Sequence, residues 1–533
     1  MKKIFSVVLA LLNITCIISQ TEFDAMKMIQ PDITGTARYM GMAGAFGALG
    51  GDASAIKDNP AGLGIYRSSE MTCTLNYLNQ NSSSSWNDTK GSDVYNGLGF
   101  NNLAYIYAKP THRYETENTG FLSSNWSFSF NRLKNFDRNS NINGAKQASS
   151  ITDYMGYFTG KITSADMSFT DPVYDPYQNV DIPWISIIGS DGHLINETVT
   201  SGISSWNSVL NTGENVIPSF NIQERGSIDE YSIGWAGNFS NNLYFGTNMN
   251  MQGINYSKIS QYKESFENGG GMTLSNTLTT MGLGINLSGG IIYQPMDAFR
   301  MGFSIHTPSV YFMTDINYAN LDYYLTPTSN GNFDSPSATN VYLLSSPWKF
   351  NASAAIILGQ KGLISGEYAI SYNTGAYFLD KNNSTQNYTD ENNGIPTMLK
   401  DVKTLKIGAE YKYSKNLAFR IGYANMSAGT NPLADKLLRP NTTRTDLEYL
   451  INNSTNFITA GIGYRKSGWF IDAAFVYKIE NETFYSYNSF AKDLLTNMQK
   501  RFPTETDLTK LMVNPANVNT ISNNIVITAG FKF

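Results

Sequence analysis

Residues 402–414 read Val-Lys-Thr-Leu-Lys-Ile-Gly-Ala-Glu-Tyr-Lys-Tyr-Ser. From Leu405 onward every second side chain is apolar or aromatic. The positions between are polar or glycine, namely Thr404, Lys406, Gly408, Glu410 and Lys412. A helix would spread these charges around its circumference, whereas a strand points them all to one face. The stretch therefore predicts a β-strand with one apolar and one polar face.

The same alternation recurs along the chain and ends in Ile525, Ile527, Ala529, Phe531 and Phe533. A strand that crosses a membrane needs ~9–11 residues, with lipid-facing and lumen-facing side chains alternating. Fourteen segments fit this description, an even number as in single-chain bacterial barrels. They are 69–79, 98–109, 120–131, 228–239, 242–254, 275–294, 298–313, 347–359, 362–372, 402–414, 416–426, 456–466, 469–480 and 520–533.

The connections between these segments alternate in length. Short ones are expected at 110–119, 240–241, 295–297, 360–361, 415 and 467–468. Long ones are expected at 80–97, 132–227, 255–274, 314–346, 373–401, 427–455 and 481–519. Bacterial barrels have short periplasmic turns and long external loops. The sequence thus predicts an all-β fold, a fourteen-stranded antiparallel transmembrane β-barrel with its C-terminus on the periplasmic side.

Composition agrees with this class. Charged residues make up 15% of the 533 residues, against about 25% in typical soluble proteins, and aromatic residues reach 13%. Past the N-terminus no apolar run approaches the ~20 residues of a membrane helix, which excludes a polytopic helical protein. The net charge of -5 gives no basic surface for nucleic acid. Two cysteines make a disulfide scaffold or a thiolate metal site improbable.

The N-terminus predicts export. Lys2 and Lys3 precede an apolar stretch from Ile4 to Ile18, which is too short to span a membrane. We interpret residues 1–20 as a secretory signal peptide; the alternative is a buried apolar helix.

Residues 34–66 do not alternate, and small residues dominate them. Small residues permit close approach of backbones in a confined space, and Pro60 indicates a rigid turn. Gly-Asp-Ala-Ser-Ala at 51–55 is followed by a four-residue motif, Asn59, Pro60, Ala61 and Gly62. This stretch resembles the N-terminal hatch of the FadL/TodX family of outer-membrane transporters for hydrophobic compounds. It is closer still to the Bacteroidetes version, often labelled a hemin receptor.

The resemblance implies a barrel plugged by its own N-terminus, and a ligand that outer loops capture and hatch movement releases. The domains would be a signal peptide (1–20), a hatch (21–67) and a barrel with long loops (68–533). In the family a sideways exit arises at a kinked third strand. Here residues 121–131 contain neither Gly nor Pro, so any kink needs another cause.

The largest expected loop, 132–227, contains the apolar run 183–188. This run either packs inside an ordered loop or forms an apolar capture surface facing outward.

Alternation also predicts which charges point into the lumen. They are Arg300, His306, Lys349, Glu367, Lys406, Glu410, Lys412, Arg420 and Asp472. Of these, Arg300, Lys406 and Arg420 are candidates to bind an anionic head group such as a carboxylate. The alternative is a network of paired charges that lines a polar interior and holds the hatch.

Catalytic motifs are missing, and no enzyme activity, cofactor or metal is predicted. Ser304 and His306 share a strand face, but residues two apart are too distant for reliable proton transfer. Haem ligation would need an axial ligand such as His193 or His306, and no pattern singles them out.

Two classes of function follow. The first is a passive outer-membrane transporter for long-chain fatty acids, similar amphiphiles or haem. The second is a surface binding or adhesion barrel with no transport role. An apolar cavity between hatch and wall would favour the first. Expected partners are a hydrophobic or amphipathic small molecule, outer-membrane lipid, and the outer-membrane assembly machinery through Phe533. We expect a monomer in the bacterial outer membrane.

Overall fold

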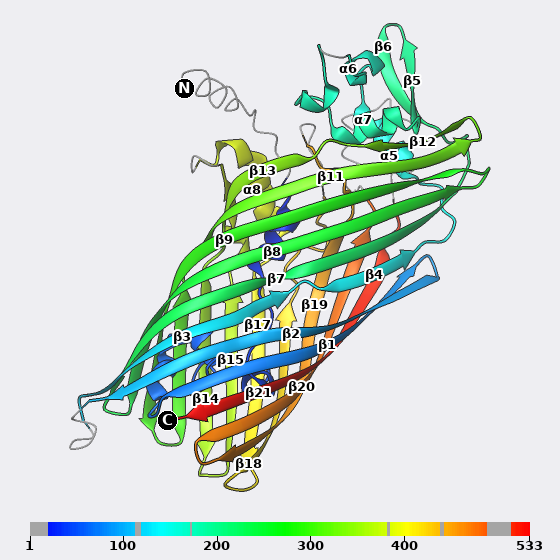
Figure 1. The fold of residues 1–533 in the computed structure, drawn as a ribbon. Coiled ribbons are helices and arrows are strands. Elements are labelled where there is room, and N and C mark those ends of the chain that lie inside the picture. Colours follow the sequence, from blue (N-terminus) through cyan, green and yellow to red (C-terminus); the bar gives the residue numbers. More distant parts are fainter. Residues whose placement is uncertain (1–19, 112–118, 171–172, 381–383, 437–441, 488–512) are drawn as a thin grey trace, which may run out of the picture.

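The computed structural model describes residues 20–111, 119–170, 173–380, 384–436, 442–487 and 513–533. The long strands among these residues form an antiparallel sheet. It closes on itself because β21 (Ala516–Lys532) pairs with β1 (Glu70–Trp86). Figure 1 shows the strands tilted around the resulting barrel. The predicted signal peptide lies outside the described residues, except for Gln20.

Ten barrel strands are continuous in the described part of the chain. Besides β1 and β21 they are β2 (Thr89–Pro110), β7 (Val216–Phe239), β8 (Leu243–Phe266), β9 (Gly271–Met296), β17 (Val402–Lys412), β18 (Leu417–Ser427), β19 (Tyr449–Lys466) and β20 (Trp469–Tyr485). An eleventh strand is β3 (Phe121–Asn135), which β4 (Arg138–Asn143) continues along β7 after a short interruption.

Three further barrel strands are each interrupted once at a similar height. They are β10 (Phe299–His306) with β11 (Val310–Thr326), β13 (Ala338–Ser345) with β14 (Lys349–Leu358), and β15 (Gly362–Ser371) with β16 (Tyr377–Leu379). β12 (Ser329–Asp334) pairs with the end of β11. The described residues thus contain fourteen barrel strands, which confirms the predicted fold class and strand number.

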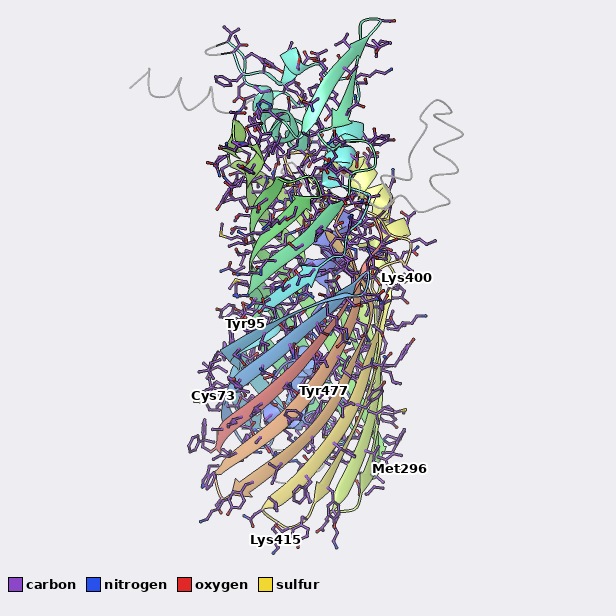
Figure 2. The ribbon with its side chains drawn as sticks, turned by 90° about the vertical axis from the view of Figure 1, so that its right-hand side faces the viewer. Cys73, Tyr95, Met296, Lys400, Lys415 and Tyr477 are labelled. Carbon is purple, nitrogen blue, oxygen red and sulfur yellow. The ribbon has the colours of Figure 1, made fainter. Side chains whose placement is uncertain are left out.

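The two ends of the barrel differ. At one end, here called the turn end, short turns join neighbouring strands, for example at 240–242, 413–416 and 467–468. Figure 2 shows Lys415 in such a turn at the lower tip. The other end, here called the loop end, carries the longer connections.

The connection expected at 80–97 is not a loop. β1 and β2 stay paired up to Trp86 and Thr89, and a two-residue turn joins them at Asn87 and Asp88, which have φ angles of 47° and 66°. Such positive φ values are typical of type I′ hairpins. Alternation missed this extension because strands beyond the lipid have water on both faces, while the backbone ladder still pairs. β8 and β9 are longer still, at 24 and 26 residues.

The outer face of the barrel is apolar. Half-exposed side chains on it include Leu405, Ile407, Ile421, Ile458 and Ile527. Exposed aromatic residues gather near the turn end, where Phe533 stacks on Tyr105 and Tyr464 packs against Trp469. An apolar band bordered by aromatic residues is typical of barrels embedded in lipid. Among the helices described, none has the length and apolar character to cross a membrane.

An outer unit, of which residues 144–170 and 173–215 are described, stands on the loop end (Figure 1). It contains α5 (Ile151–Thr159), α6 (Ser164–Met167), η3 (Pro176–Gln178), α7 (Trp184–Asp191), β5 (Ile195–Thr200) and β6 (Ile203–Ser208). The apolar run 183–188 forms most of α7, and Ile185, Ile187 and Ile188 are fully buried. The run therefore packs inside the outer unit and is not an exposed capture surface. A smaller loop holds η4 (Asn373–Gly375), η5 (Gln386–Tyr388) and α8 (Thr389–Met398).

The N-terminal segment, defined here as residues 20–66, lies inside the barrel, where Figure 1 draws it in blue. It contains α2 (Glu22–Ile29), α3 (Ala37–Met40), η1 (Ala55–Lys57) and η2 (Pro60–Ile65). Thr21 and Asp24 form a capping box that starts α2. The buried side chains Tyr39, Met42 and Phe46 share a core with inward-facing Ala424 and Phe457 of the wall.

Glycines on the inner wall make room for this segment. A Cβ atom on Gly408 would lie 2.6 Å from the Met42 carbonyl oxygen, and one on Gly422 would lie 2.5 Å from the Met42 carbonyl carbon. Side chains at these positions would displace the segment from β17 and β18.

Candidate functional site: two cavities between the N-terminal segment and the wall

The motif at 59–62 lies against the inner face of β9. The side-chain amide of Asn59 donates to the Gly47 carbonyl at 2.7 Å and to the Ile291 carbonyl at 3.3 Å. Its oxygen accepts from the Ala61 N–H at 3.1 Å and caps η2. Gly62 packs on Gly50, and a Cβ added to Gly50 would lie 2.6 Å from the Gly62 Cα. The motif thus forms a tight turn that is hydrogen-bonded to the barrel wall.

The wall opposite Asn59 has no room for a side chain. A Cβ on Gly290 would lie 2.0 Å from the Asn59 Oδ1 atom. We expect Gly290→Val to weaken docking of the N-terminal segment by roughly 1–3 kcal/mol, the usual cost of overpacking. Limited proteolysis of the purified barrel would then cleave residues 20–66 faster than in the wild type. Gly366→Val is the matched control, because no atom lies within 4 Å of its added Cβ; equal protection in both variants would contradict the prediction.

An ion network joins α3 to the wall. Arg38 donates to Glu410 from Nε at 2.9 Å, and Arg420 donates to the same carboxylate at 2.7 Å. Arg420 also contacts Asp472 at 2.6 Å. The Arg420, Glu410 and Asp472 side chains are at most 4% exposed. The predicted ligand residue Arg420 is therefore engaged by two carboxylates.

A second network surrounds Lys406. Its ammonium contacts Glu367 at 2.7 Å and Asp58 at 3.1 Å, and Lys57 contacts Asp58 at 3.1 Å. Glu367 also accepts the Gly47 N–H at 2.8 Å. Burial would raise the pKa of Asp58, but the Lys406 and Lys57 ammonium groups outweigh it, so this pKa lies below its ordinary value. The Asp58 carboxylate is thus ionised and ties the segment to β17.

Arg300 binds the N-terminal segment through a backbone carbonyl oxygen. Its guanidinium donates to the Leu49 carbonyl at 3.0 Å and to Gln294 at 3.1 Å. All three predicted ligand residues therefore contact the N-terminal segment or its anchors, and the structure does not gather them at one point. A role in ligand binding stays a prediction for each. Lys412, also expected in the lumen, is exposed at the end of β17.

Ser304 and His306 do not face each other as a catalytic pair. The Ser304 hydroxyl donates to the Asp58 carbonyl at 2.6 Å, and the His306 Nε2 lies 3.0 Å from the same oxygen. Both side chains anchor the segment. His193 follows α7 in the outer unit, at a positive φ of 53°.

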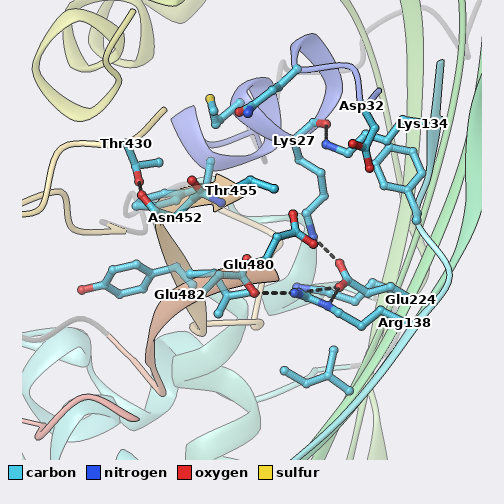
Figure 3. A pocket seen from close by; sticks show the side chains of 18 of the residues that line it. Lys27, Asp32, Lys134, Arg138, Glu224, Thr430, Asn452, Thr455, Glu480 and Glu482 are labelled. Carbon is cyan, nitrogen blue, oxygen red and sulfur yellow. Dashed lines mark hydrogen bonds and ion pairs between the residues drawn. The ribbon is translucent and has the colours of Figure 1, made fainter. Parts of the chain in front are cut away.

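Two cavities remain between the segment and the wall. The first, here called the outer cavity, has a volume of about 210 Å³ and lies toward the loop end. Figure 3 shows Arg138 bridging Glu224 and Glu482 beside it, with Lys27 reaching to Glu224. The other charged residues that line it are Asp24, Asp32, Lys134, Asp137, Lys258, Lys436, Glu448, Lys478 and Glu480.

The second, here called the inner cavity, has a volume of about 160 Å³. Its lining mixes apolar residues such as Ile33, Phe350 and Val402 with charged ones, including Glu230, Lys349 and Lys406. Polar and charged groups are prominent in both cavities, which differs from the apolar pocket that sequence analysis expected for a transporter.

The cavities meet at a neck formed by Gln30, Pro31 and Asp32, which line both of them. The Gln30 amide lies 2.7 Å from the Met426 sulfur, and Met426 also lines both cavities. The Asp32 N–H donates to the Leu133 carbonyl at 2.8 Å, and its carboxylate contacts Lys478 at 2.6 Å. The end of α2 thus separates the two spaces.

Lys134, on β3, was missed by sequence analysis because the expected strand stopped at 131. The pairing of β3 with β7 shifts between Arg132 and Lys134, so Leu133 is an extra residue. A bulge of this kind changes which side chains face inward. Lys134 consequently lines the outer cavity.

A seam in the wall adjoins the outer cavity. The ladder between β2 and β3 ends at Asn102 and Asn131, and no backbone pairing joins β2 to β4 in the described residues. The third barrel strand is interrupted here, between β3 and β4, where the Asp137 carboxylate accepts the Gly226 N–H at 3.0 Å and the Tyr95 hydroxyl at 2.8 Å. This interruption lies beyond residues 121–131, the stretch in which sequence analysis found neither Gly nor Pro to cause a kink. Gly226, on β7 beside this interruption, has a φ of 116°, a conformation that favours glycine.

Comparison with known proteins gives structural matches only. No family model matches the chain, and no curated protein matches its sequence. A FadL homologue from Pseudomonas aeruginosa has a TM-score of 0.51 at 12% identity, over 94% of this chain and 99% of that chain. The toluene transporter TodX from P. putida has a TM-score of 0.50 at 11% identity, over 94% and 99%. The likeness extends over nearly the whole of each chain, and the fold of this protein is that of the FadL/TodX family.

Proposed function

We propose that this chain is a passive outer-membrane channel for hydrophobic or amphipathic small molecules, such as long-chain fatty acids. The observation that carries the proposal is the pair of adjacent cavities between the N-terminal segment and a closed, lipid-facing barrel. In this proposal residues 1–20 are a cleaved signal peptide, 21–67 a hatch and 68–533 the barrel of a monomer. The bacterial outer membrane is its site, reached by an assembly route that reads Phe533.

A ligand would enter the outer cavity from the loop end and reach the inner cavity past the neck. Passage requires the N-terminal segment to shift, because Gln30, Pro31 and Asp32 lie between the two spaces. Besides its apolar core with the wall, the segment is held by ion pairs and single hydrogen bonds, which can exchange partners without unfolding the barrel. Movement of the hatch would thus control release.

The seam beside the outer cavity supports a sideways exit. Side chains seal it, for example Asn139, which donates to the Val94 carbonyl at 3.3 Å, and Tyr95, which donates to Asp137 at 2.8 Å. Such contacts open more readily than a continuous backbone ladder. A hydrophobic molecule leaving here would enter lipid directly.

Uptake into vesicles tests the proposal. The purified protein is placed in vesicles containing lipopolysaccharide, and entry of a fatty acid, toluene and haemin is measured separately. We expect at least one probe to enter roughly tenfold faster than into protein-free vesicles. If all three enter at the protein-free rate, the transport proposal fails. The probe that enters also identifies the ligand class. Entry of haemin alone would favour haem uptake over transport of fatty acids or toluene.

The outer unit favours a second candidate, a surface binding barrel with no transport role. The unit shares one buried core with the loop end of the barrel, and it also exposes Phe169, Val173, Val199 and Ile203. Replacing residues 145–214 with a short Gly/Ser linker distinguishes the two functions. Loss of cell-surface binding with unchanged uptake would support adhesion as a separate activity of this unit.

A further inference from the structure

Each cavity contains one lysine whose ammonium group has a single protein hydrogen bond among the described residues. Lys134 in the outer cavity donates to the Lys27 carbonyl at 2.8 Å. Lys349 in the inner cavity donates to the Ile29 carbonyl at 3.3 Å. No carboxylate in the described chain lies within ion-pair distance of either. An ammonium has three N–H donors, so donors remain free on each.

The other cations around the cavities form ion pairs with carboxylates. Lys27 pairs with Glu224, Lys258 with Asp446 and Glu448, and Lys478 with Asp32 and Glu480. Asp32 and Glu480 attract Lys134 only from beyond ion-pair distance, and Lys27 and Lys478 repel it. Glu230 and Asp58 attract Lys349 from beyond ion-pair distance, and Lys57 repels it. Both lysines are only partly exposed, so their free donors need an acceptor from within the cavity.

Both lysines contact the last turn of α2, Lys134 from β3 and Lys349 from β14. The carbonyl groups at a helix C-terminus lack partners within the helix and carry partial negative charge. Lys134 and Lys349 supply cations to these groups, and the helix leads directly into the neck. The two contacts therefore hold the neck in place as well as placing an ammonium in each cavity.

We propose that Lys134 and Lys349 are two successive binding sites for a single anionic head group, such as a carboxylate, one on each side of the neck. This inference rests on the proposed function, that a ligand traverses the lumen. An anion that binds the free donors of Lys134 draws the ammonium toward itself and away from the Lys27 carbonyl, and so loosens the end of α2. Past the neck, Lys349 offers the same head group a second ammonium. The preferred substrate is then an anionic amphiphile, and the corresponding uncharged molecule binds weakly.

Binding to the purified full-length barrel in a non-ionic detergent tests this. Equilibrium dialysis compares dodecanoate with dodecanol and dodecyltrimethylammonium, which differ in charge at the same chain length. We expect dodecanoate to bind at least tenfold more tightly than the other two, since a charge-assisted hydrogen bond has about this effect. Lys134→Met and Lys349→Met should each remove one of the two tight sites, so that the number of dodecanoate molecules bound tightly falls by about half, and should leave dodecanol binding unchanged.

Three control variants keep the test specific. Lys134→Arg and Lys349→Arg retain the charge and should bind dodecanoate within about threefold of the wild type. Lys403→Met removes an exposed lysine of β17 and should have no effect. Retention of the compact, heat-modifiable form on gels shows that each variant is folded.

Hydrogen exchange reports the neck itself. Dodecanoate should speed amide exchange at residues 27–33 of the wild type, and it should not do so in the Lys134→Met variant. Equal dodecanoate binding by the wild type and both Met variants, or no change in exchange, overturns the inference and leaves the proposed function standing. Failure of the wild type to bind either dodecanoate or dodecanol counts against both.

Discussion

Replacing Glu410 with alanine is expected to open the barrel to ions. Glu410 is the shared acceptor of Arg38, on the N-terminal segment, and Arg420, on the wall. Its loss leaves Arg38 without a carboxylate in the described network and removes one of the two partners of Arg420. Removing one member of a buried ion pair costs about 3–5 kcal/mol. We therefore expect the segment to leave the lumen often enough to raise single-channel conductance in planar bilayers severalfold.

The control is Glu267→Ala, which removes the same charge from a surface pair. Glu267 contacts Lys146 at the loop end, where the two side chains are 39% and 53% exposed. Pairs of this kind contribute at most about 1 kcal/mol, so its conductance should match the wild type. Glu410→Asp, which keeps the carboxylate, should restore most of the closed state. Wild-type conductance in Glu410→Ala would show that the ion network does not hold the segment.

A disulfide between the motif and β9 is expected to stop transport reversibly. The Cγ atom of Asn59 would lie 2.9 Å from a Cβ on Gly290. In a disulfide, each sulfur lies about 3 Å from the other residue's Cβ, as the S–S length and bond angles require. Asn59→Cys with Gly290→Cys, in a Cys73→Ser background, should therefore form a bond that fixes the segment to the wall.

Uptake of the probe that enters wild-type vesicles should fall at least tenfold in the oxidised double variant. Reduction with dithiothreitol should restore it, because only the bond prevents movement. The two single Cys variants, treated with the same oxidant, control for the loss of Asn59 and of Gly290. Undiminished uptake in the fully oxidised protein would mean that ligand passes without movement of this part of the segment.

The strand number followed from alternation, as residues 402–412 and 520–532 illustrate. Lipid on one side and water on the other impose a period of two wherever a strand crosses the membrane. The same rule identified Glu367, Lys406, Glu410, Arg420 and Asp472 as inward-facing, and all five are buried. Alternation could not find the strand ends near Trp86 and Thr89, because no lipid constrains them there.

The sequence could not predict which groups these charges pair with. Arg38 and Glu410 are 372 positions apart, and Asp58 and Lys406 are 348 apart. Only closure of the barrel around the segment brings them together. Lys134 was missed for a local reason, since the extra residue Leu133 reverses the inward and outward order at that point.

By itself, the sequence determined the lipid-facing barrel and its fourteen strands, since each strand encodes its own two faces within ten residues. It also indicated a compact segment of small residues at 34–66. The tertiary structure decided which charges pair, where the two cavities and the neck lie, and that Lys134 and Lys349 face those cavities. These features depend on contacts between distant strands and a segment enclosed by all of them, and no local pattern records such contacts.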